Sequence, residues 1–84
     1  MRTVKVYTKE GCQFSQSVIS LLDAREYPYE EIVVTLDSPE HHELGEKTGS
    51  MKLPQVFIGA IPMGSNQEFL AADQNGMLAE LIAD

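Results

Sequence analysis

The chain has 84 residues, of which 43% are hydrophobic and 23% charged, with a formal net charge of -7. This size predicts one domain, residues 1–84, because two domains would each fall below the usual lower limit of about 50 residues. The acidic balance argues against a nucleic-acid partner, whose phosphates it would repel. No apolar run approaches the roughly 18 residues that span a bilayer, and the first residues do not form a signal sequence, so we expect a cytoplasmic protein without membrane contact.

The first half of the chain predicts a strand, a helix and a second strand. Residues 3–7 alternate apolar and polar side chains, the period of two that is typical of a strand. The apolar residues between positions 13 and 25 form one helical stripe. Residues 31–34 are a short, mostly β-branched run of the kind that is buried in a parallel sheet.

The second half predicts a helix, a hairpin and a carboxyl-terminal helical region. Residues 37–40 have the capping and proline pattern of a helix start, and Gly49 is the expected stop. Residues 55–63 form two short strands around a Gly-Ala turn, with a proline that favours an edge strand. Residues 69–82 form a helical stripe interrupted at positions 75–76. The expected fold is α/β, βαβαββα, with a four-stranded mixed sheet flanked by helices.

Cys12 is the single cysteine and the main candidate for chemistry. It precedes the first predicted helix, whose unsatisfied N–H groups and dipole favour a thiolate, and Lys9 adds a nearby cation. Such surroundings lower the pKa of a cysteine from about 8.5 to between about 3.5 and 7.5. The alternative, a small buried apolar residue, is disfavoured by the polar neighbours of Cys12. The chain offers too few ligands for a four-ligand zinc site, so no metal site is predicted.

Four segments carry motifs in a consistent order and spacing. They are Lys9–Ser15 (KEGCQFS), Leu53–Ile58 (LPQVFI), Gly64–Glu68 (GSNQE) and Asn75–Leu78 (NGML). Together they make essentially the whole chain resemble the glutaredoxins, small proteins that use glutathione. The first segment is similar to the Lys-x-x-Cys-x-(Tyr/Phe)-(Cys/Ser) turn of that family, and the second to its cis-proline segment. The resemblance implies a thioredoxin-like fold.

The resemblance also implies a role for each matching position. Cys12 would be the attacking thiol, and Lys9 would lie near a carboxylate of glutathione. Leu53, before a cis Pro54, would offer backbone groups to the cysteinyl part of glutathione. The backbone N–H groups of residues 66–67 would bind its γ-glutamyl carboxylate at a helix start. The implied glutathione site consists of Lys9, Phe14, Leu53, Pro54, Asn66 and Gln67.

The sequence departs from the family pattern around two positions. Gln67 replaces an acid that binds the γ-glutamyl ammonium in the family, Ser65 replaces a glycine, and Glu68 is a neighbouring acid that offers compensation. Ser15 stands where two-thiol members have the resolving cysteine. Alternatives for Ser15 are a first-turn residue that satisfies a backbone group, or a substitution made in a two-thiol parent. Without a second thiol, Cys12 would stay glutathionylated until a second glutathione releases it.

We therefore expect a glutathione-dependent thiol-disulfide oxidoreductase, a monomer acting on glutathionylated proteins or small disulfides. The alternative is a binding protein with a [2Fe-2S] cluster, held between two chains by Cys12 of each and two glutathiones. Gln13 and the two residues between Lys9 and Cys12 resemble the transferase branch of the family instead. A third class is a redox-inert scaffold.

Four further groups of residues receive lesser assignments. The histidines at 41–42 are expected on a solvated face, and the tyrosines at 27 and 29 are expected to serve packing. The methionines at 51 and 63 are expected to fill the core or a pocket. Lys47 and Lys52 are candidate cations for the glycyl carboxylate of glutathione, against the alternative of plain solvated lysines.

Overall fold

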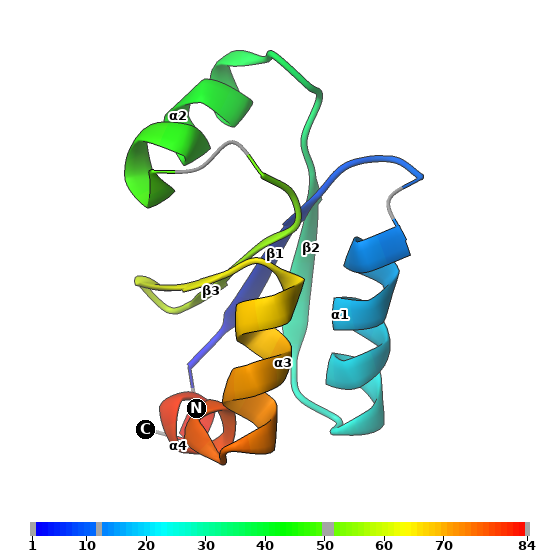
Figure 1. Ribbon diagram of the computed structural model, residues 1–84, viewed down its shortest axis with the longest axis vertical. Helices are drawn as coiled ribbons and strands as arrows, with labels where there is room; N and C mark the ends of the chain where they lie inside the picture. Colours follow the sequence, from blue (N-terminus) through cyan, green and yellow to red (C-terminus); the bar gives the residue numbers. More distant parts are fainter. Residues whose placement is uncertain (1, 12, 50–51, 84) are drawn as a thin grey trace.

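The computed structural model describes residues 2–11, 13–49 and 52–83, which form a four-stranded sheet with helices around it (Figure 1). The strands are β1 (Val4–Thr8), β2 (Tyr29–Val33), β3 (Gln55–Ile58) and β4 (Ile61–Gly64). The helices are α1 (Gln13–Ala24), α2 (Pro39–Thr48), α3 (Asn66–Gln74) and α4 (Met77–Ala83). The strand order is β2-β1-β3-β4, with β1 parallel to β2 and antiparallel to β3, and β3 antiparallel to β4. The expected mixed sheet is confirmed.

The hydrophobic core lies between one face of the sheet, α1 and α3, with α4 closing one end (Figure 1). Alternation along β1 sends Val4 and Val6 into the core and leaves Lys5 exposed, as the period of two predicts. The core cluster contains Val4, Val6, Val18, Leu22, Val56, Ile58, Phe69, Ala72, Leu78 and Ile82. Tyr27, Tyr29 and Met63 pack against it, which confirms their expected packing role, whereas Met51 lies outside the described residues.

Helix α2 has the bounds that its capping residues predict. The hydroxyl oxygen of Ser38 accepts a hydrogen bond from the N–H of His41, and Pro39 occupies the first turn. The helix ends at Gly49, which adopts the left-handed conformation with φ 74°. Among the residues of α2, His41 and Leu44 are buried. The expectation of a solvated His41 is therefore wrong; its Nδ1 accepts a hydrogen bond from the N–H of Asp37 at 3.1 Å.

The carboxyl-terminal region is two helices, so the element order is βαβαββαα and not βαβαββα. Gly76 has φ 82° and redirects the chain between α3 and α4. The side-chain oxygen of Asn75 accepts a hydrogen bond from the N–H of Met77 at 2.9 Å, which starts the second helix. The amino-terminal segment is joined to α4, because the N–H of Arg2 donates to the carbonyl of Ile82 at 2.8 Å.

Strand β2 is an edge strand and not a buried one, which corrects the expectation for residues 31–34. Its Glu30 and Glu31 are exposed, and Val33 has 64% of its surface accessible. The buried member of the β-branched run is Val34, which follows the strand. The run looks like a buried strand because residues 32–34 are apolar, but β2 has a neighbour on one side only and carries acids that favour solvent. Within the described ranges, no helix is long and apolar enough to cross a membrane.

Candidate functional site

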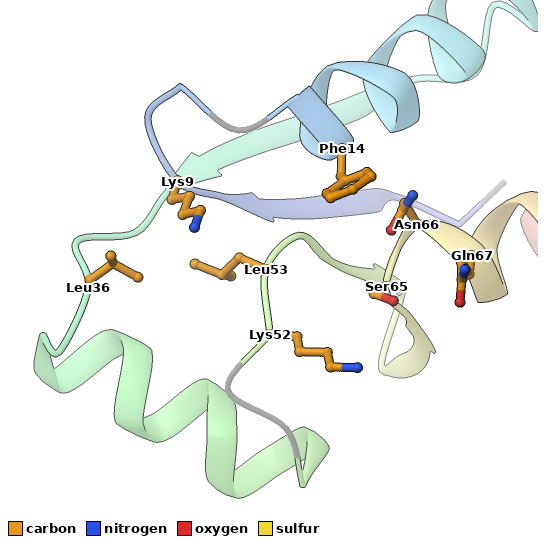
Figure 2. A pocket seen from close by; sticks show the side chains of 8 residues that line it. All are labelled: Lys9, Phe14, Leu36, Lys52, Leu53, Ser65, Asn66 and Gln67. Atoms are coloured by element: carbon orange, nitrogen blue, oxygen red, sulfur yellow. The ribbon is translucent and has the colours of Figure 1, made fainter.

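A cavity of about 480 Å³ lies where five separate segments of the chain meet (Figure 2). They are the end of β1, the first turn of α1, the β2–α2 connection, the segment before β3 and the start of α3. The lining residues are Lys9, Phe14, Leu36, Lys52, Leu53, Ser65, Asn66 and Gln67. The size is that of a pocket for a small molecule. We call this cavity the main pocket.

The main pocket combines positive charge with apolar side chains. Lys9 and Lys52 are its charged lining residues, in a chain whose net charge is -7. Phe14 and Leu36 stay 60% and 55% exposed, which is unusual for such large apolar side chains. In Figure 2, Lys9, Leu36 and Leu53 point toward one another on one side of the pocket. This lining suits an anionic ligand that also has an apolar part.

The start of α3 forms the other side of the main pocket. The N–H groups of Asn66 and Gln67 have no acceptor within the helix, because the first N–H groups of any helix lack one. They also lie at the positive end of the helix dipole, a position that favours the binding of a carboxylate or phosphate. The pocket therefore combines these backbone donors with the positive charges of Lys9 and Lys52.

Glu68 does not line the main pocket and is hydrogen-bonded to the residue that precedes α3. Its Oε2 accepts a hydrogen bond from the hydroxyl of Ser65 at 2.7 Å. This hydrogen bond, those from the backbone N–H groups of Glu68 and Ser65, and the charge of Lys52 lower the pKa of the Glu68 carboxyl below 4.5. Glu68 lines a separate cavity of about 190 Å³ next to the main pocket.

Ser15 is buried, and its hydroxyl has no hydrogen-bond partner among the residues that the structure describes. The interpretation of Ser15 as a residue that satisfies a backbone group is therefore wrong. It lines a second cavity of about 320 Å³ on the β2 side of α1, together with Thr8 and Glu31. These two bind each other instead, since the Thr8 hydroxyl donates to Oε2 of Glu31 at 3.0 Å. Cys12 lies outside the described residues.

The structure brings most of the predicted glutathione site together. The predicted residues that line the main pocket are Lys9, Phe14, Leu53, Asn66 and Gln67. Pro54 does not line it, and its side chain is fully buried. The Leu53–Pro54 bond is cis, as the resemblance implies, and Leu53 is the member of the pair that reaches the pocket.

The structure also places three residues that are not part of the predicted glutathione site, namely Lys47, Lys52 and Leu36. Lys52 lines the main pocket, whereas Lys47 lies elsewhere and pairs with Glu43 at 3.3 Å, so Lys47 is a solvated lysine. Leu36 lines the main pocket and was not predicted. The available indication was its position, directly before a helix start and after a parallel strand, where the sites of α/β folds gather.

Comparison with known proteins agrees with the family resemblance found in the sequence. Residues 4–60 match the family model for Glutaredoxin. The chain belongs to the glutaredoxin family. This glutaredoxin is 28% identical over 82 residues to glutaredoxin 3 of Escherichia coli (strain K12), covering 98% of this chain and 99% of that protein. It is 29% identical to glutaredoxin 1 of Rickettsia typhi, covering 98% of this chain and 81% of that protein.

Solved glutaredoxin structures have the same fold. The holo form of glutaredoxin C1 from Populus tremula x tremuloides superposes with a TM-score of 0.84 at 30% identity, covering 96% of this chain and 83% of that one. A buckwheat glutaredoxin-glutathione complex superposes with a TM-score of 0.87 at 24% identity, covering 95% and 76%. The thioredoxin-like fold is confirmed, and family membership implies that this glutaredoxin is a thiol oxidoreductase.

Proposed function

We propose that this glutaredoxin is glutathione-dependent and removes glutathione from mixed disulfides by a monothiol mechanism through Cys12. The observation that carries the proposal is the main pocket, which adjoins the turn before α1 and offers lysines, apolar walls and free helix N–H groups to one ligand. Glutathione has the matching chemistry, because it is an anionic peptide with a thiol at its centre. The buckwheat structure of the same fold is a complex with glutathione, which supports the choice.

The first step is a thiol-disulfide exchange at the sulfur of the bound glutathione. The Cys12 thiolate attacks that sulfur, a Cys12–glutathione disulfide forms, and the disulfide between glutathione and the substrate protein breaks. The substrate leaves as a thiolate and takes a proton from water. Cys12 lies one residue before the first residue of α1, where the helix dipole lowers the pKa of a thiol.

The second step needs a thiol from solution, because Cys12 is the single cysteine of the chain. The thiolate of a second glutathione attacks the glutathione sulfur on Cys12, so glutathione disulfide forms and the Cys12 thiolate is regenerated. The sum converts one mixed disulfide and one glutathione into one free protein thiol and one glutathione disulfide. Ser15 takes no part as a nucleophile in this cycle.

The test is a steady-state assay with glutathione and a glutathionylated peptide. Cys12→Ser should lose at least about 99% of the turnover, because the chain offers no other thiol. Turnover in Cys12→Ser close to that of the parent would exclude the proposal. The [2Fe-2S] alternative gives a different result, a coloured protein with visible absorbance that Cys12→Ser removes.

A further inference from the structure

The lining of the main pocket is unbalanced in charge. Lys9 and Lys52 are positive, and the other described lining residues are neutral. Glutathione is a zwitterion at one end, since its γ-glutamyl group carries a carboxylate and an ammonium on the same carbon. A pocket that bound both charges would need an acid close to the place where it binds that carboxylate.

The start of α3 fixes where that acid would have to stand. If the N–H groups of Asn66 and Gln67 bind the carboxylate, the ammonium lies within a few ångströms, beside the first turn of α3. The pocket-lining side chain in that turn with a suitable length is Gln67, which is exposed and uncharged. A neutral amide oxygen on the surface gives an ammonium little more than water does.

The nearest acid in this part of the chain does not fill the gap. Glu68 accepts a hydrogen bond from Ser65 at 2.7 Å and lines the neighbouring cavity, where the charge of Lys52 acts on it. A turn toward the main pocket would break the hydrogen bond with Ser65, which is the largest cause of the lowered pKa of Glu68. The compensation by Glu68 that the sequence suggests is therefore opposed by the geometry.

We propose that the main pocket recognises the carboxylates of its thiol ligand and is indifferent to the α-ammonium group. The substrate class then extends to anionic cysteinyl peptides that lack this group, such as glutaryl-cysteinyl-glycine, which is glutathione without its amino group. The proposal rests on the proposed function, because it takes the main pocket as the glutathione site.

The test compares two mixed disulfides of one fluorescent peptide, carrying either glutathione or glutaryl-cysteinyl-glycine. The reduced protein is mixed with each, without a second thiol, and the release of the peptide thiolate is followed in a single turnover. The two second-order rate constants should agree within about twofold, since an exposed neutral amide contributes little to binding an ammonium. A preference for glutathione above about fivefold, the value of a good exposed ion pair, would overturn the inference.

A pair of variants makes the test specific to the first turn of α3. Gln67→Glu should create a preference for glutathione of about two- to fivefold, because the new carboxylate pairs with the ammonium. Gln74→Glu adds the same charge to an exposed position at the other end of α3 and should leave the ratio of the parent unchanged. An equal ratio in the parent and Gln67→Glu would show that the ammonium does not lie beside residue 67, and the inference would be wrong.

Failure of the proposed function has a separate outcome in the same experiment. If neither disulfide releases peptide faster with the parent than with Cys12→Ser, the protein is not a glutathione-dependent oxidoreductase and both proposals fall. If glutathione reacts through Cys12 and the deaminated analogue reacts more than about fivefold more slowly, the function stands and the indifference to the ammonium is wrong.

Discussion

The hydroxyl of Ser15 is a buried polar group without a hydrogen-bond partner in the described part of the chain, so its removal should stabilise the protein. An unsatisfied buried hydroxyl costs about 1–3 kcal/mol of desolvation, and alanine also favours a helix slightly. Ser15→Ala should raise the free energy of unfolding by about 1 kcal/mol in urea denaturation. The control is Ser20→Ala, an exposed position of α1 that reports helix propensity alone. An increase in the free energy of unfolding that is no larger for Ser15→Ala than for Ser20→Ala would show that the buried hydroxyl is not destabilising.

Ser65 should set the acid behaviour of Glu68. The folded pKa of Glu68 lies below 4.5, chiefly because of the Ser65 hydroxyl, so this contribution to stability is full above pH of about 4.5 and is lost as the pH falls through the folded value. In Ser65→Ala the pKa of Glu68 should rise toward 4.5, as NMR titration of the carboxyl would show. The stability difference between parent and variant should shrink between about pH 6 and about pH 3. A difference that grows on acidification would have the wrong sign.

At the scale of single residues, the sequence predicts those parts of the site that are held in short motifs. Lys9, Phe14 and Leu53 lie in two such motifs, and they line the main pocket. The unpartnered hydroxyl of Ser15 and the burial of His41 were not predictable in this way, because both depend on which face of a helix meets the rest of the fold.

At the scale of the elements, a bidentate ion pair joins α1 and α3 near their carboxyl ends. Arg25 donates from Nε to one carboxylate oxygen of Asp73 at 3.2 Å and from a terminal nitrogen to the other at 3.0 Å. Asp73→Asn should lower the melting temperature by about 2–5 °C, since bidentate pairs with one sheltered partner are the effective ones. The control is Glu43→Gln, which breaks the exposed Lys47–Glu43 pair of α2 and should change the melting temperature by less than about 1 °C. Equal shifts in both variants would refute this role.

The helices and strands also show which sequence patterns are sufficient to predict the bounds and burial of an element. The bounds of α2 follow from Ser38, Pro39 and Gly49, because a cap acts on the backbone of its own helix. The burial of β2 was wrongly predicted, because the place of a strand in a sheet depends on pairing with strands far away in the chain. A break at Gly76 was visible in the sequence, but the fold alone shows that it separates two helices.

At the scale of the whole molecule, the main pocket is a product of the complete fold. Its lining comes from residues 9–14, 36, 52–53 and 65–67, which are brought together by the parallel pairing of β1 with β2 and the antiparallel pairing of β1 with β3. No one segment of the described chain carries the charge, the apolar walls and the helix start together. The sheet topology therefore explains why residues so distant in the chain meet at one pocket.

Helix α2 has few buried residues, and this affects how easily it opens locally. This helix is held by two buried residues, His41 and Leu44, and the segments before and after it supply Leu36 and Lys52 to the main pocket. Local opening of α2 should therefore open the pocket wall without unfolding the core. Backbone amides of α2 should exchange with deuterium faster than those of α1. Saturating glutathione added to Cys12→Ser should slow exchange in α2, but not in α1 beyond its first turn, where Phe14 lines the pocket. Equal protection of both helices would mean that the wall is as rigid as the core, and that glutathione enters a pocket that is already fixed.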